Sequence, residues 1–455
     1  MLKNIRTLSP FSLVLLFISF TMSISQSTMT TAYPILMKQF GIDAAAVQWV
    51  TSAFMVAMTL VMPLSPWLLD NLHLKALLNV IVATFLVGTA IAMVTPNFLG
   101  VIVGRLLEGM AVGALFPTYQ AVIMENTPKE ERGIAMGAVG LVMSSALAVG
   151  PIVSGIVLQF GTWRLLFAFF FVVLLALITL MQGQIKNTHQ LNKRDFDFLS
   201  AFLLIGFAGI LYTVSILPTK GWSISLAVTL IVSIVLLAIF VRRQLKQDNP
   251  FLDLRVFEHQ GYLPAMLLTG MSYSGLITAT VIMPLYFQKV FGLAPLWSGL
   301  LMIPGAAFLS FLNPKTGRLL GQIGLRPLVL IGSTMMIAGY LFLAFFGTKF
   351  LLLAIIGAML LEGGNAFIMM PAVTAASNAL PNHLISHGTA IITTMRQLIG
   401  ASSILLAGIL IGFFHNVHSY GLSLNMTAGW FVLIPLSGYL LATRIKAVNP
   451  DVEVD

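Results

Sequence analysis

The chain has 455 residues, of which 58% are hydrophobic and only 9% are charged. Soluble domains carry about a quarter charged residues, so this composition excludes an ordinary soluble protein and indicates a membrane protein. The sequence contains no cysteine, which excludes disulfides, thiol catalysis and cysteine-ligated metal sites.

Hydrophobic runs recur along the whole chain. An α-helix needs about 20 residues to cross the roughly 30 Å hydrocarbon core of a bilayer. We expect fourteen transmembrane helices, at approximately residues 12–36, 46–69, 76–94, 97–124, 134–160, 165–185, 198–218, 222–241, 262–287, 295–314, 328–347, 349–378, 388–413 and 425–444. The first run is too long for a signal-peptide core and lacks a clear cleavage site, so we expect it to form helix 1.

The distribution of Lys and Arg predicts the orientation of these helices. If the N-terminus, with Lys3 and Arg6, is cytoplasmic, the inner loops hold seventeen of the 24 basic residues and the outer loops hold five. Two more, Arg105 and Arg396, lie inside predicted helices. This asymmetry predicts cytoplasmic N- and C-termini, and it accounts for the net charge of +9 without a nucleic-acid partner.

An internal repeat runs through the sequence. Leu-Leu-Glu-Gly at residues 106–109 recurs at residues 360–363, an offset of 254, and a proline stands nine residues after each Glu, as Pro117 and Pro371. Matches at one offset and at equivalent places in the topology indicate two parallel structural halves, an arrangement that many secondary transporters have.

The offset is larger than six helices need, and the excess fits an inserted helix pair. We therefore predict an all-α polytopic membrane protein with fourteen transmembrane helices arranged as 6+2+6. We expect the first six-helix bundle at residues 1–196, the inserted pair with a cytoplasmic linker at residues 197–258, and the second six-helix bundle at residues 259–455.

Two acidic residues lie deep inside predicted helices, Glu108 in helix 4 and Glu362 in helix 12. Each lies near the middle of its helix and so close to the bilayer midplane, at 1.5 Å per residue. A carboxylate is costly there, and removal from water favours its protonated form. Both are candidates for proton coupling or substrate binding. The alternative is a structural Glu that neighbouring hydroxyls or an arginine hold in place.

Two arginines are candidate partners of these carboxylates. Arg105 precedes Glu108 by three residues and is expected on the same helix face. This pair either holds Glu108 ionised until a substrate or a proton breaks it, or neutralises both charges permanently. Arg396 in helix 13 is the second intramembrane cation, and it is a candidate partner of Glu362.

The residues that catalysis requires are absent from the sequence. It has no G-x-x-x-x-G-K-[ST] phosphate-binding loop and no nucleophile–base constellation. His383 and His387 have a spacing that two metal ligands use, but no acidic or cysteine ligand supports them. We therefore expect no enzyme activity, no metal site and no cofactor.

The chain resembles the major facilitator superfamily over essentially its full length, and within it the fourteen-helix branch of drug:proton antiporters. Residues 104–109, Gly-Arg-Leu-Leu-Glu-Gly, resemble the helix-4 motif that this family links to proton coupling, with Glu108 where the family usually has Gln. Trp163-Arg164 resembles the pair that opens helix 6 in this branch.

Three further segments match the family's motifs only in part. Helix 5 contains small residues that by themselves indicate close helix packing and that resemble the family's exporter motif: Gly137, Gly150, Pro151 and Gly155. The gating loop between helices 2 and 3, with its repeat in the second half, keeps only part of the family pattern, in Asp70, Lys75, Arg318 and Arg326. Helix 1 lacks the usual Asp and offers Ser25, Ser27 and Thr30 ahead of Pro34, which strengthens the assignment of Glu108 and Glu362 as the coupling carboxylates.

The resemblance implies proton-coupled efflux of amphipathic, cationic or zwitterionic drugs by alternating access across a bacterial cytoplasmic membrane, by a monomer in contact with membrane lipid. An exporter of the same fold with one narrow substrate, such as a tetracycline-like compound, a metabolite or a lipid precursor, is the nearest alternative. A proton-coupled importer is the next alternative. A non-transporting receptor or scaffold is a third class, and two midplane carboxylates argue against it.

Overall fold

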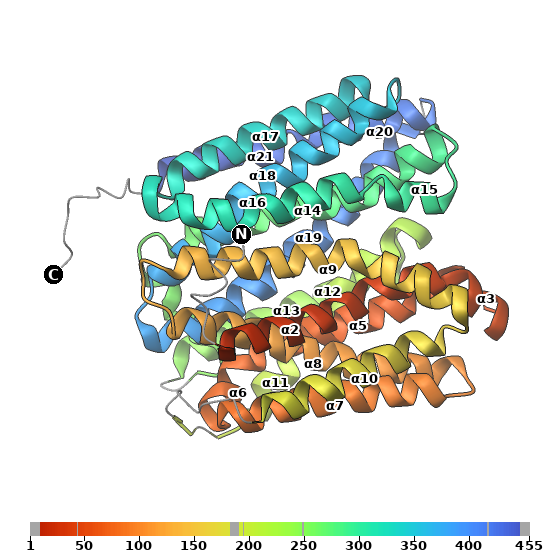
Figure 1. Ribbon diagram of the computed structural model, residues 1–455. Helices are drawn as coiled ribbons and strands as arrows, with labels where there is room; N and C mark the ends of the chain where they lie inside the picture. Colours follow the sequence, from red (N-terminus) through yellow and green to blue (C-terminus); the bar gives the residue numbers. More distant parts are fainter. Residues whose placement is uncertain are drawn as a thin grey trace. The chain divides into compact units, whose positions relative to one another are not determined.

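The computed structural model describes residues 10–42, 44–182, 191–193, 195–247, 250–415 and 418–445 (Figure 1). This part of the chain is built from helices and contains no β-strand, as the sequence predicts. Both chain ends, with Lys3 and Arg6, lie outside the described residues, so the cytoplasmic position of the termini stays a prediction.

The helices follow one another with short connections. Up to the end of the expected inserted pair they are α2 (Pro10–Thr28), η1 (Met29–Ala32), α3 (Tyr33–Phe40), α4 (Ala44–Val47), α5 (Trp49–Val61), η2 (Met62–Leu64), α6 (Ser65–Asn71), α7 (Leu74–Val94), α8 (Phe98–Glu125), α9 (Arg132–Phe160), α10 (Arg164–Met181), α11 (Phe198–Leu203), α12 (Ile205–Lys220) and α13 (Ile224–Lys246). They continue as η3 (Leu254–Glu258), α14 (Tyr262–Leu285), η4 (Tyr286–Val290), α15 (Pro295–Leu300), α16 (Ile303–Ile323), α17 (Leu325–Phe346), α18 (Leu351–Asn378), η5 (Asn382–Leu384), α19 (Ile385–His415), α20 (Tyr420–Phe431) and α21 (Leu433–Thr443).

Helical segments cover most of every expected transmembrane range, but several ranges are divided into shorter helices. The range 46–69 is one example, since Pro63 lies in the first turn of η2 and Pro66 in the first turn of α6, and proline has no backbone N–H with which to continue an α-helix. Among the described residues, nine helices are long and apolar enough to cross a membrane, or ten if the bent pair Val153–Phe160 and Arg164–Leu180 forms one span. The number fourteen therefore stays a prediction.

The chain folds into two compact units. Unit 1 comprises Met1–Ile123, Val142–Arg255 and His383–Thr394, and unit 2 comprises Met124–Leu141, Val256–Asn382 and Met395–Asp455. In unit 1, α10 packs against α2 and α7, and α12 packs against α5 and α13. In unit 2, α18 is the central helix and packs against α14, α16 and α17 (Figure 1). The sequence-based division into residues 1–196, 197–258 and 259–455 stays a prediction.

The internal repeat is visible in the helices themselves. α8 and α18 both have 28 residues, and each contains its repeat proline, Pro117 and Pro371, within the helix. In each unit this helix also meets the helix before it through glycine. A Cβ added to Gly88 of α7 would lie 2.6 Å from the Gly104 carbonyl oxygen, and one added to Gly339 of α17 would lie 2.8 Å from that of Gly357.

The inserted helix pair is held together at its linker end by one carboxylate. Asp197 caps α11 by accepting from the Ser200 N–H at 3.1 Å, and it accepts two hydrogen bonds from Arg243 of α13, at 2.9 and 3.1 Å. Burial raises the pKa of Asp197, but hydrogen bonds from Arg243, Ser200 and Gln247 lower it further, so that the pKa lies below its ordinary value. The carboxylate is therefore ionised at any physiological pH and joins α11 to α13 permanently.

Aromatic rings join this linker end to α6, which together with α5 and η2 covers most of the expected helix 2. The Trp67 ring of α6 lies 4.8 Å from the Phe196 ring and 6.3 Å from the Phe251 ring, centroid to centroid. At the other end of helix 2, Trp49 of α5 lies 6.1 Å from Tyr212 of α12. The inserted pair is thus packed along helix 2 of unit 1.

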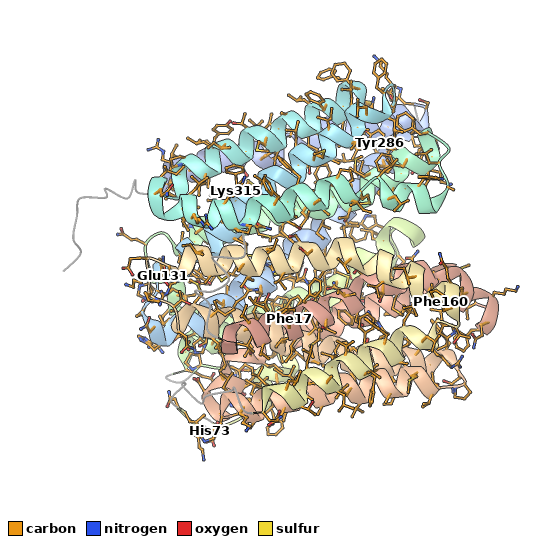
Figure 2. All side chains as sticks on the ribbon, viewed as in Figure 1. Phe17, His73, Glu131, Phe160, Tyr286 and Lys315 are labelled. Atoms are coloured by element: carbon orange, nitrogen blue, oxygen red, sulfur yellow. The ribbon has the colours of Figure 1, made fainter. Side chains whose placement is uncertain are left out.

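The described surface is rich in apolar side chains that other protein atoms leave largely uncovered. Phe17 of α2 is 58% exposed and Phe160 of α9 is 81% exposed (Figure 2). α13 has the highest mean hydropathy of the candidate spans, 3.0, and only 17% of its most apolar window is buried in protein. Such faces are stable against lipid hydrocarbon, which agrees with a multi-pass membrane protein.

Candidate functional site

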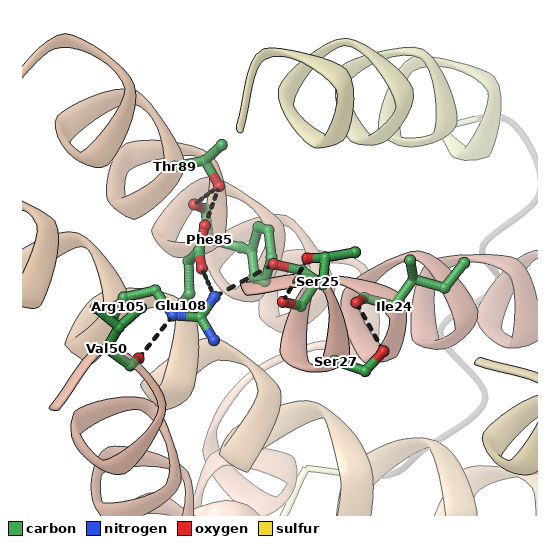
Figure 3. Close-up of polar contacts among 9 residues, drawn as sticks. Ile24, Ser25, Ser27, Val50, Phe85, Thr89, Arg105 and Glu108 are labelled. Carbon is green, nitrogen blue, oxygen red and sulfur yellow. Dashed lines mark hydrogen bonds and ion pairs between the residues drawn. The ribbon is translucent and has the colours of Figure 1, made fainter. Parts of the chain in front are cut away.

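Arg105 and Glu108 of α8 form a fully buried ion pair in unit 1 (Figure 3). Arg105 Nη1 donates to Glu108 Oε2 at 2.5 Å, and both side chains are 0% exposed. Residues three apart lie on one face of a helix, so local geometry alone brings the two side chains together. The sequence-based prediction of one shared face is therefore correct.

Neighbouring helices complete the coordination of this pair. Thr89 of α7 donates to Glu108 Oε1 at 2.7 Å. Arg105 Nε donates to the Val50 carbonyl oxygen of α5 at 3.1 Å, and Nη1 donates to Ser25 Oγ of α2 at 3.4 Å. The guanidinium also lies over the Phe54 ring, 4.3 Å from its centroid. Each charge is therefore compensated by its partner and by polar groups of three other helices.

One nitrogen of the Arg105 guanidinium lacks a hydrogen-bond partner among the described residues. Arg105 Nη2 is buried and has no hydrogen-bond partner among the described residues. Ser25 of α2, one of the residues that helix 1 offers in place of the expected Asp, contacts this guanidinium through Nη1. Thr89, Val50 and Phe54 were not predicted, because a threonine or a phenylalanine in an apolar helix carries no signal of its own.

Glu362 of α18 has a different environment. It is 5% exposed, and its carboxylate makes no hydrogen bond or ion pair with any residue that the structure describes. Its carboxylate lies against the backbone of α16, since a Cβ added to Gly305 would lie 2.8 Å from Oε1. Glu362 is thus a buried carboxyl without a countercharge at the repeat position of Glu108.

Arg396 of α19 is buried as predicted, at 2% exposed, but it does not form an ion pair with Glu362. Its guanidinium carbon lies 5.3 Å from the centroid of the Tyr273 ring on α14. The structure therefore does not bring together the two residues that we considered as partners. A helix position shows the depth of a residue in the membrane, but not the neighbour that its side chain meets.

The two acidic positions are consequently suited to different chemistry. A carboxylate paired with a buried arginine stays ionised while the pair is intact. A carboxyl that has left water and has no countercharge is most stable when it is protonated, and it ionises when water or a cation reaches it. Glu108 therefore has a countercharge beside it, and Glu362 has none among the described residues.

The glycines of α9, the expected helix 5, lie in three different environments. A Cβ on Gly137 would lie 2.8 Å from the Asn313 carbonyl oxygen of α16, in unit 2. A Cβ on Gly150 would meet the Ser27 side chain of α2, in unit 1, while one on Gly155 would meet no atom within 4 Å. Pro151 belongs to α9, but its side chain lies outside the described part of the structure.

These environments predict different effects of adding one methyl group. Gly137→Ala places a methyl against backbone atoms that cannot rotate away, and we expect a loss of stability of about 1–3 kcal/mol. Gly155→Ala is the matched control in the same helix, and we expect no loss because its Cβ enters open space. Thermal unfolding of the two purified variants in detergent measures the difference, and equal unfolding temperatures would contradict this packing.

The expected gating loop between helices 2 and 3 makes hydrogen bonds to residues 182 and 192. Lys75 Nζ donates to the Gln182 carbonyl oxygen at 2.7 Å, and the carbonyl oxygen of Asp70, whose side chain is buried, accepts from the Asn192 N–H at 2.9 Å. Arg318 and Arg326 are exposed, and neither forms an ion pair with a described residue.

Comparison with known proteins assigns the chain to a family. The family model described as Major Facilitator Superfamily matches residues 15–404. The chain belongs to the major facilitator superfamily. Members of this family are transporters, so this major facilitator protein is a transporter and not an enzyme, as the sequence predicts.

Similar proteins agree with this assignment. The chain is 34% identical to a Bacillus subtilis protein named "Uncharacterized MFS-type transporter YcnB", over 95% of this chain and 94% of the relative. It is 31% identical to the "Lincomycin resistance protein LmrB" of Listeria monocytogenes, over 83% of this chain and 81% of the relative. Its fold is similar to that of the human organic anion transporter MFSD10, with a TM-score of 0.69, 15% identity, and coverage of 96% of this chain and 100% of that one.

Proposed function

We propose that this major facilitator protein exports amphipathic drugs, cationic or zwitterionic, in exchange for protons. The observation that carries the proposal is Glu362, a carboxyl that is 5% exposed and has no countercharge among the described residues. Such a group is stable in protein only if it binds a proton or a cation, and an antiporter needs a site where these two compete.

The proposed cycle uses Glu362 as the exchange site. Substrate from the cytoplasm or the inner leaflet reaches the midplane and binds beside the ionised carboxylate. A proton from the outside then neutralises Glu362 and releases the substrate outward. Inward movement of each proton supplies about 2.3 kcal/mol per 100 mV of membrane potential, in addition to the pH gradient.

Arg105 and Glu108 have a second role in this proposal. Their ion pair joins α8 to α2 through Ser25 and to α5 through Val50. Because these helices have to shift for access to alternate, we propose that protonation of Glu108 breaks the pair during the cycle. The topology in this proposal is the fourteen-helix 6+2+6 arrangement in a bacterial cytoplasmic membrane, with both termini inside.

Export is supported by two observations. The helix-5 residues resemble the exporter motif, and Gly137 and Gly150 make close helix contacts. A relative at 31% identity is named for resistance to lincomycin. That name refers to one drug, and it favours a second candidate, a narrow-substrate exporter of the same fold.

Transport in proteoliposomes tests the proposal. The purified protein is reconstituted, and a pH gradient is imposed with the acidic side at the predicted outer face. We expect ethidium or lincomycin to move against its concentration gradient and the movement to stop when nigericin collapses the pH gradient. Movement of ethidium and lincomycin together supports the broad-range exporter, and movement of lincomycin alone supports the second candidate. Transport that continues after collapse of the gradient contradicts proton coupling.

A further inference from the structure

Unit 2 contains a hollow that the proposed transport cycle does not use. Its volume is about 600 Å³, and its lining comes from η4, from the turn between α17 and α18, and from the beginning of α20. According to the topology predicted from the sequence, these are the loops after helices 9, 11 and 13, which all lie on the outer side of the membrane. The hollow therefore lies at one end of the unit, and the lining residue nearest to Glu362 in sequence is Lys349, 13 residues before it.

Two lysines give this hollow its charge. Lys289 of η4 and Lys349 of the α17–α18 turn both line it. These are two of the five basic residues in the predicted outer loops, and residues 286–302, 344–352 and 418–425 contain no Asp or Glu. Positive charge from two separate segments therefore meets at one place without a neutralising carboxylate in any lining segment.

The wall behind the lysines is held by hydrogen bonds. Asn425 of α20 is 7% exposed, and its Oδ1 accepts from the Tyr286 hydroxyl at 3.0 Å. Its Nδ2 donates to Thr348 Oγ1 at 3.1 Å. Asn425 thereby ties together the three segments that line the hollow. Figure 2 marks Tyr286 at this end of the unit.

The local backbone is also unusual. η4 is a π-helix of five residues, Tyr286–Val290, that continues α14 after Pro284. π-Helical turns are rare and occur frequently at functional sites, because the extra residue redirects the side chains that follow. Here the π-helical segment carries Lys289, so the irregular backbone and the charge belong to the same few residues.

One side of the hollow is apolar and open to the surroundings. Phe345 is 62% exposed and Leu422 is 44% exposed, and both belong to the lining. Exposed apolar residues at a helix end are stable where they meet lipid, and aromatic residues are enriched at that interface. The hollow therefore presents a basic polar part and an apolar part side by side.

We propose that this hollow binds a phospholipid with an anionic headgroup. Lys289 and Lys349 contact its phosphate, the Ser419 hydroxyl donates to a headgroup oxygen, and Phe345 and Leu422 pack against an acyl chain. Ammonium groups are suited to phosphate as point charges, and only an amphipathic anion satisfies the basic and the apolar part together. The membrane supplies such a molecule at high concentration.

Binding of soluble short-chain lipids to the full-length protein in detergent tests this site. Affinity is measured by microscale thermophoresis for dioctanoyl phosphatidylglycerol, dioctanoyl phosphatidylcholine and inorganic phosphate. The variant is Lys289→Gln/Lys349→Gln. The matched control is Lys129→Gln/Lys315→Gln, which removes two exposed charges from other parts of unit 2.

We expect phosphatidylglycerol to bind the Lys289→Gln/Lys349→Gln variant about tenfold more weakly than the wild type and to bind the control with unchanged affinity. All four lysines are exposed, so we expect both variants to unfold at the wild-type temperature. Equal binding of phosphatidylglycerol and phosphatidylcholine overturns the proposal, as does equal binding by both variants. Inorganic phosphate that binds as tightly as phosphatidylglycerol overturns the lipid assignment, because it shows that the apolar part does not contribute.

Discussion

Replacement of Glu362 by glutamine is expected to abolish gradient-driven transport while the protein remains as stable as the wild type or becomes more stable. Glutamine has nearly the shape of a protonated glutamate, so it fits against Gly305 without a clash. It cannot ionise, and so it cannot exchange a proton for a cationic substrate. The substitution also removes the desolvation free energy that a buried ionisable group without a countercharge costs the folded protein.

The expected result separates function from stability, which a merely structural glutamate would not do. We expect Glu362→Gln to lose proton release on addition of ethidium and transport in proteoliposomes, while its unfolding temperature in detergent stays equal or rises. Glu258→Gln is the matched control, because it makes the same chemical change at an exposed residue of unit 2. Full pH-driven transport by Glu362→Gln would exclude Glu362 as the exchange site.

Replacement of Arg105 by methionine is expected to destabilise the protein by about 3–5 kcal/mol, because it leaves Glu108 buried without its countercharge. The substitution also removes the hydrogen bonds to the Val50 carbonyl oxygen and to Ser25, and it removes the contact with the Phe54 ring. We therefore expect loss of both stability and transport, in contrast to the result for Glu362→Gln.

A double-mutant cycle isolates the ion pair within this effect. Arg105→Met/Glu108→Met removes both charges, and we expect it to recover most of the stability that Arg105→Met loses. Thr89→Val is the milder control, since it removes one hydrogen bond to Glu108 and is expected to cost about 1 kcal/mol. If Arg105→Met unfolds at the wild-type temperature, the buried pair does not hold these helices together.

These expectations assign unequal roles to the two halves of a repeated protein. The repeat places Glu108 and Glu362 at equivalent depths of two helices of equal length, but only Glu108 has a cationic partner. The repeat position of Arg105 is Met359, three residues before Glu362. The second half therefore has the carboxylate of the repeat without its countercharge.

Much of the architecture was predictable from the sequence because its causes are local or compositional. The apolar content requires a membrane environment, the length of each run predicts a helix, and the repeat of Leu-Leu-Glu-Gly predicted that α8 and α18 correspond. The contact of Arg105 with Glu108 also has a local cause, because residues three apart in one helix lie on the same face. The hydrophobic pattern did not show the breaks within spans such as 46–69.

Only the tertiary structure decided which residues meet across helices. The contacts of Thr89 and Ser25 with the ion pair, the isolation of Glu362 and the position of Arg396 beside Tyr273 all depend on how each helix is rotated about its axis. A helix that is apolar on every face has no amphipathic pattern from which that rotation can be inferred. The sequence therefore determined the fold class, the depth of the charges and the pairing within one helix, while packing between helices decided which charge has a partner and which has none.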